Sequence, residues 1–94
     1  MQLSADAAET LALKALSWLV NHDELLPVFL GATGASEGDV RARASEPEFL
    51  GSVLEFLTMD DAWVIAFCDA HAVGYDLPML ARAVLLGHAD MHWT

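Results

Sequence analysis

Apolar residues recur along the chain at the three- and four-residue spacing of amphipathic helices, and no stretch alternates as a strand would. Ala and Leu, which favour helix, dominate the composition. The first predicted helix runs from about Ser4 to Val20, with Ser4 as its N-cap and Asn21 as its stop. Its inward stripe consists of Ala8, Leu11, Ala12, Ala15, Leu16 and Leu19.

A glycine turn separates the next two predicted helices. The second helix starts near Asp23 and ends at Gly31 and Gly34, because glycine favours the left-handed conformation in which helices often end. A short third helix begins at Ser36, which forms an approximate capping box with Asp39. The pattern therefore predicts a helix, a tight turn and another helix.

Capping residues also delimit the later helices. The segment Ser45-Glu-Pro-Glu48 predicts a capping box with proline in the first turn, and the fourth helix extends to about Thr58. Gly74 is expected to end the fifth helix. The sixth helix is predicted from its cap, Asp76, to Gly87.

The fifth predicted helix is apolar on most of its sides. It spans about Ala62 to Ala72, with Asp60 or Asp61 as its cap. Because a helix that is apolar all round is usually buried, we expect it at the centre of the domain. The residues expected to fill the centre of the core are Trp63, Val64, Phe67 and Cys68.

These elements predict an all-α fold, a single compact domain of five to six short helices in an orthogonal or antiparallel bundle. The 94 residues fit one domain, with residues 86–94 as a C-terminal tail that can be flexible. No stretch approaches the roughly 18 apolar residues that a membrane span needs, and the N-terminus has no signal-peptide pattern. Cys68 is the only cysteine, so an internal disulfide is impossible, and we expect a cytoplasmic protein.

The charge balance restricts the partners. There are 14 acidic residues and 4 basic residues, giving a formal net charge of -10. Nucleic-acid affinity comes mainly from Lys and Arg, so this balance makes nucleic acid an unlikely partner and also disfavours anionic membranes. It suits a basic partner. With 55% hydrophobic residues, the chain is also expected to expose apolar surface for a partner protein or a second copy.

One motif conflicts with that charge. Residues 29–40 resemble the middle of a DNA-binding helix-turn-helix, in which the helix from Ser36 to Ala44 would enter the major groove. Glu37 precedes Arg41 by four residues, and Asp39 precedes Arg43 likewise, which predicts two stabilising ion pairs. We interpret the turn as architecture and keep nucleic-acid binding as an alternative.

A metal site is a second alternative. Cys68 and His71, followed by His88 and His92, provide a C-x2-H and an H-x3-H spacing, and structural zinc prefers four such ligands. The competing interpretation is a core cysteine with unconnected histidines. Cys68 and His71 also lie one helical turn apart, a spacing that can lower the pKa of a thiol.

The sequence contains no recognisable catalytic motif. Acidic pairs stand at residues 23–24 and 60–61, where helices begin, so capping explains them. We find no glycine-rich phosphate loop, and we predict a protein that is not an enzyme and needs no cofactor. Trp18 and Trp63 are expected in the core. In the tail, Trp93 beside Met91 either docks on its own domain or anchors a partner.

The chain resembles a small helical family of alphaproteobacteria, the domain-of-unknown-function family DUF3572. The resemblance implies an all-helical cytoplasmic domain and provides no catalytic or binding residues. The tail from His88 onward departs from the family pattern, which disfavours the four-ligand zinc site. The positions that carry the resemblance are Trp18-Leu-Val, Phe29-Leu-x-x-Thr-Gly34, Asp39-Val-Arg41, Pro47-x-Phe-Leu-x-x-Val-Leu-x-Phe56-Leu, Asp60-Asp, Phe67-Cys, Asp76-Leu-Pro and Ala81-Arg82-Ala.

The leading hypothesis for function is a non-enzymatic protein-interaction module that acts through apolar surface on an acidic body, with a homodimer as one form of it. It rests on excess hydrophobicity without a chemical motif. The nucleic-acid regulator and the small metal-binding domain remain the alternatives.

Overall fold

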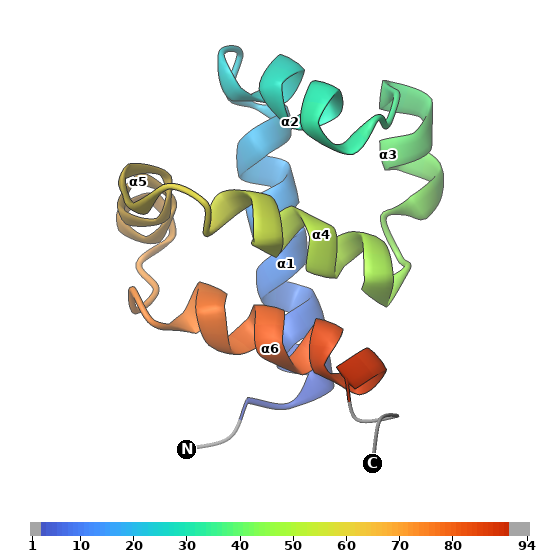
Figure 1. Cartoon of the computed structure of the whole chain (residues 1–94). Helices are drawn as coiled ribbons and strands as arrows, with labels where there is room; N and C mark the ends of the chain where they lie inside the picture. The colour runs from blue at the N-terminus through green and yellow to red at the C-terminus, as the bar shows by residue number, and fades with distance from the viewer. Residues whose placement is uncertain (1–2, 91–94) are drawn as a thin grey trace.

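The computed structural model describes residues 3–90, and the side chains of residues 3–87. Within that range the chain forms six α-helices and no strand, which confirms the all-α prediction (Figure 1). The helices are α1 (Ala5–Val20), α2 (Leu25–Thr33), α3 (Glu37–Arg43), α4 (Pro47–Leu57), α5 (Asp61–His71) and α6 (Leu77–Asp90).

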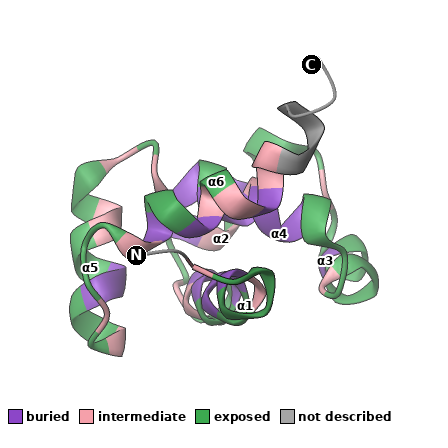
Figure 2. Ribbon diagram, turned by 90° about the horizontal axis from the view of Figure 1, so that it is seen from below, coloured by how far each residue is buried: buried purple, intermediate pink, exposed green. Residues whose placement is uncertain are grey.

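Three helices make up the centre of the domain. α4 and α6 lie side by side and run in opposite directions, and both cross α1 (Figure 1). These three helices pack on one another more extensively than any other pair among the described elements. α3 and α5 lie at opposite ends of this assembly, and most of the outward surface of each is exposed (Figure 2).

The centre of the core is α4, and the expectation that α5 would occupy it is wrong. Seven of the eleven residues of α4 are buried: Phe49, Leu50, Gly51, Val53, Leu54, Phe56 and Leu57. In α5 only Phe67 and Cys68 are buried, and Ile65 is 48% exposed. The alanines that make α5 look apolar bury little surface, so the larger side chains of α4 gain more from the central position.

The starts of the helices follow their caps in most cases. Ser4 accepts a hydrogen bond from the backbone N–H of Ala7, as predicted for α1. Both halves of the Ser36–Asp39 capping box are present at α3. The predicted box at Ser45 is wrong, because the N-cap of α4 is Glu46 and its side chain makes no capping hydrogen bond.

The helix ends depart from the glycine pattern in three places. Gly34 ends α2 with a left-handed φ of 74°, as expected, whereas Gly31 lies inside that helix. α5 ends at His71, close to the predicted bound, but its left-handed C-cap is Ala72, with a φ of 56°, and not the predicted Gly74. Gly87 also lies inside a helix, since α6 continues past it and includes the first residues of the predicted tail. A glycine inside a helix costs about 1 kcal/mol, which the surrounding packing offsets.

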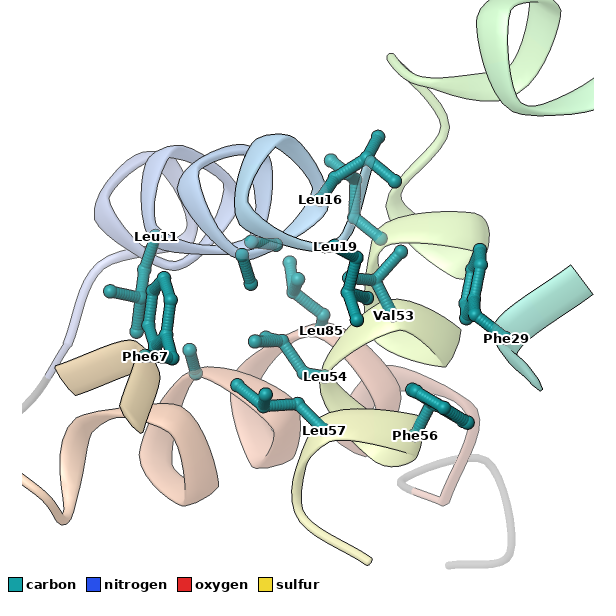
Figure 3. Packing of buried hydrophobic residues seen from close by; sticks show 14 of the residues in the cluster. Leu11, Leu16, Leu19, Phe29, Val53, Leu54, Phe56, Leu57, Phe67 and Leu85 are labelled. Atoms are coloured by element: carbon teal, nitrogen blue, oxygen red, sulfur yellow. The ribbon is translucent and has the colours of Figure 1, made fainter. Parts of the chain in front are cut away.

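A chain of aromatic rings links the outer helices to α4. Phe29 of α2 meets Phe56 of α4 edge-on, with ring centroids 5.3 Å apart (Figure 3). Phe56 in turn stacks on Trp63 of α5 at 4.8 Å. On the other side of the core, Phe67 lies beside Leu11 of α1 (Figure 3). Such contacts between rings stabilise beyond their buried area.

Within the described residues, no helix has the length and hydropathy that crossing a membrane requires.

Candidate functional site

The segment predicted as a helix-turn-helix does form a helix, a turn and a second helix, and its turn is specified by capping. Gly34 takes the left-handed conformation that ends α2, and Ser36 with Asp39 caps α3. Hydrogen bonds to Ser36 hold the pKa of the Asp39 carboxyl below its ordinary value of 3.8. Val40 is the one buried residue among the seven of α3, so this helix is held to the domain by little apolar contact.

The predicted ion pairs of α3 do not form as expected. Asp39 directs its carboxylate to the backbone N–H of Ser36, at 3.0 Å, and so serves the cap. Arg43 bonds forward to Glu46 instead, with 3.1 Å between Nε and Oε1, and its guanidinium lies over the ring of Phe49. The prediction from the four-residue spacing considered only pairs within one helix, whereas Ser36 and Glu46 both lie outside α3.

Arg41 lies in a different environment from Arg43. It lines a groove, which we call the α3 groove, with a volume of about 440 Å³. Among the side chains that the structure describes, no carboxylate is within ion-pair distance of its guanidinium. The residues that line the α3 groove are Val20, Leu26, Glu37, Val40, Arg41 and Ala44.

The first turn of α3 is poorly suited to phosphate. In a helix-turn-helix, this turn approaches the bases and the backbone of the DNA. Here it exposes Glu37 and Asp39, and both carry negative charge. The local field therefore opposes a polyanion at the point where contact would be closest.

The Cys68 thiol is a buried group. It is 1% exposed, and its S–H donates to the backbone carbonyl of Gly74 at 3.5 Å. Burial raises the pKa of the thiol, and the negative charges of Asp69 and Asp76 raise it further. The lowered pKa that the spacing to His71 can produce is therefore not found, and the His71 ring lies against Phe67 with 4.8 Å between centroids.

The structure describes the side chains of only two of the four proposed zinc ligands, Cys68 and His71 of α5. Among the described side chains, no group of three or more His, Cys, Asp and Glu could hold a metal ion. The side chain of His88, and the whole of His92, lie outside the described residues, as do Met91 and Trp93. The metal site and the tail anchor therefore stay predictions.

A second hollow lies where α5 meets the segment leading to α6. It has a volume of about 350 Å³ and is lined by Asp61, Val64, Ile65 and Tyr75, and we call it the α5 hollow. The hydroxyl of Tyr75 donates a 2.6 Å hydrogen bond to Asp69 Oδ1. This bond and the charge of Asp69 raise the pKa of Tyr75 above its ordinary value of 10.0.

Sequence reasoning missed the α5 hollow because it assigned α5 to the interior. Trp63 and Val64 are half-buried and pack against the core, whereas Ile65 points away from it. Trp18 is likewise half-buried, with its ring edge against Phe67 at 6.0 Å. A helical projection would have placed Ile65 opposite Phe67, and this was the available signal.

These features define a small all-α domain with hollows at its two ends. Residues 5–88 match the sequence model of a protein family described as "Protein of unknown function (DUF3572)". Because the match covers most of the chain, the protein belongs to this family, and the resemblance seen in the sequence is confirmed. No curated protein and no solved structure matches the chain.

Proposed function

We propose that the protein is a non-enzymatic interaction module of the cytoplasm, and that its α5 hollow binds a partner segment with an apolar centre and Lys or Arg around it. One observation carries the proposal. Ile65 and Tyr75, 48% and 58% exposed, line the same hollow although they come from different elements. Large apolar side chains that gather on a surface are typical of interaction sites. A cytoplasmic location fits a buried free thiol.

The apolar surface is ordered before any partner arrives. The hydrogen bond from Tyr75 to Asp69 of α5 restrains the tyrosine side chain, which lines the hollow together with Ile65. A side chain that is already held loses less conformational entropy on binding. Met79 and Leu80, in the first turn of α6, are 53% and 40% exposed and provide further apolar surface.

Charge selects the kind of partner. Residues 60–81 contain four aspartates and no Lys or Arg, while Arg82, which follows them, contacts Met79 and is paired with Glu55 of α4. Asp61 lines the hollow, and Asp69 holds Tyr75. A partner with basic residues at its edge would complement this rim. A second copy of the chain would bring the same carboxylates to the interface, and we therefore favour a basic partner over a homodimer.

A pair of model peptides tests this choice. An amphipathic helical peptide of Leu and Lys is titrated into the ¹⁵N-labelled protein, beside the same peptide with Glu in place of Lys. We expect the cationic peptide to shift the amides of residues 61–65 and 75, and to lose affinity as salt is added. Equal binding of the anionic peptide would contradict the proposal, as would shifts that lie elsewhere.

Matched variants connect the binding to the hollow. Ile65→Ser should weaken peptide binding about tenfold or more, because it removes the apolar centre. Val28→Ser is the control, since Val28 is 49% exposed on α2 and does not line the hollow. In the native cell, a photo-crosslinking residue at position 65 should capture a partner through a Lys- or Arg-rich segment, and one at position 28 should not. Capture of a second copy through this position would support the homodimer instead.

A further inference from the structure

The α3 groove lies at the other end of the domain from the α5 hollow and has a different chemistry. We propose that it binds a free α-amino acid with an apolar side chain, whose ammonium group meets Glu37 and whose carboxylate meets Arg41. The proposal is independent of the function assigned to the α5 hollow, because the two share no lining residue.

The floor of the groove suits a small apolar body. Val20 from α1 and Leu26 from α2 face Val40 and Ala44 at α3 across it. Val20 is 43% exposed, so apolar surface there is open to solvent. A volume of about 440 Å³ lies in the range of small-molecule sites.

The charged residues lie together on one wall. Glu37 and Arg41 are four residues apart on α3, so their Cβ atoms are about 5–6 Å from each other. Neither side chain forms an ion pair with another side chain that the structure describes. In an α-amino acid a single carbon separates the ammonium from the carboxylate, and such a ligand can bridge both groups. A guanidinium also matches the two oxygens of a carboxylate.

The arrangement of charge distinguishes between classes of ligand. A simple carboxylate would be attracted by Arg41 but repelled by Glu37 and by the net charge of -10 of the chain. A simple amine would be attracted by Glu37 but repelled by Arg41. A zwitterion satisfies both side chains and adds no net charge. The interior of a peptide provides neither charge.

The test compares leucine with three analogues that each lack one feature. Protein amides of residues 20, 26 and 37–44 are followed by NMR during titration with leucine, 4-methylpentanoate, 3-methylbutylamine and glycine. We expect saturable shifts with leucine at a Kd of about 1 mM or below, and at least about tenfold weaker binding of each analogue. Equal binding of leucine and 4-methylpentanoate would overturn the zwitterion assignment. No saturable shift with leucine or with phenylalanine would overturn the site.

Variants of the wall identify the contacts. Arg41→Gln and Glu37→Gln should each weaken leucine binding at least about tenfold, and both residues are exposed, so the fold is retained. Arg43→Gln is the matched control, because Arg43 lies on the same helix but binds Glu46 and does not line the groove. Ala44→Phe should block binding by filling the groove. Unchanged affinity in Arg41→Gln would refute the proposal, as would equal losses in Arg41→Gln and Arg43→Gln.

Discussion

Gly51 of α4 faces Leu86 of α6 so closely that a Cβ atom on the glycine would lie 2.8 Å from Leu86 Cγ. The next neighbour, Leu85 Cβ, would be 3.6 Å away. Gly51 is buried, and the two helices around it form one of the most extensive contacts of the domain. The missing side chain therefore sets how near α6 approaches α4.

We predict that Gly51→Ala destabilises the protein by about 1 kcal/mol, since Leu86 must shift to admit a methyl group and the helix preference of alanine offsets only part of that cost. The control is Gly31→Ala in α2, where an added Cβ meets nothing within 4 Å. That substitution should stabilise by about 0.5–1 kcal/mol, because alanine favours the helix interior. Urea unfolding of both variants measures the difference. A stabilised Gly51→Ala would contradict the close approach.

The same two glycines show what the sequence could and could not predict. Helical periodicity located all six described helices, and local capping chemistry located Ser4, Ser36 and Gly34. Nothing in the sequence around Gly51 shows that another helix packs closely against this glycine. Its role depends on which helix packs against it, and this is a tertiary property.

The candidate surfaces were harder to predict than the helices. Counting alanine as apolar placed α5 in the interior, although its alanines 62, 66 and 70 are exposed. The α5 hollow combines Ile65 with Tyr75, ten residues further along, so its existence depends on how the chain turns at Ala72. The groove on α3 likewise needs Val20 and Leu26, which only the packing of α1 and α2 brings near.

Ala72 is strained where it ends α5. Its φ of 56° is left-handed, a conformation that costs a residue with a Cβ about 1–2 kcal/mol. Ala72→Gly should therefore stabilise the protein by about 1 kcal/mol. Ala70→Gly, at an exposed position inside the same helix, should destabilise it by about as much. Thermal unfolding of the pair provides the comparison, and two shifts of the same sign would contradict it.

The capping box of α3 makes stability depend on pH. Ser36→Ala should cost about 1 kcal/mol, because it leaves the N–H of Asp39 without its acceptor. The folded pKa of Asp39 is lowered, so its contribution is complete above the ordinary value of 3.8 and is lost as the pH falls through the folded pKa. The difference in unfolding free energy between the native protein and Asp39→Asn should therefore shrink in acid. If this difference in unfolding free energy instead grew in acid, the pKa of Asp39 would be raised in the folded protein, which would contradict the prediction.

Cys68 should behave as a protected thiol. Burial and the nearby aspartates raise its pKa, which lowers the thiolate fraction near neutral pH. We expect a disulfide reagent to modify it slowly in the folded protein and rapidly in urea. The rate should follow the population of opened molecules. Fast modification without denaturant would mean that the contact to Gly74 opens readily.

Tyr75 can be titrated without ambiguity, because it is the only tyrosine of the chain. Its pKa lies above 10.0, so the hydrogen bond to Asp69 contributes at lower pH and is lost as the pH rises through the folded pKa. Asp69→Asn should lower this pKa, and Asp76→Asn is the control, because Asp76 makes no hydrogen bond to the hydroxyl. The ultraviolet absorbance of the phenolate measures both. A pKa at or below 10.0 in the native protein would rule out the bond in solution.

α3 and α5 lie at opposite ends of the central helices, with α4 and α6 between them (Figure 2). A molecule bound at one end leaves the other end uncovered. Binding at the two proposed sites would therefore be non-competitive, and one molecule would be able to hold both ligands at once.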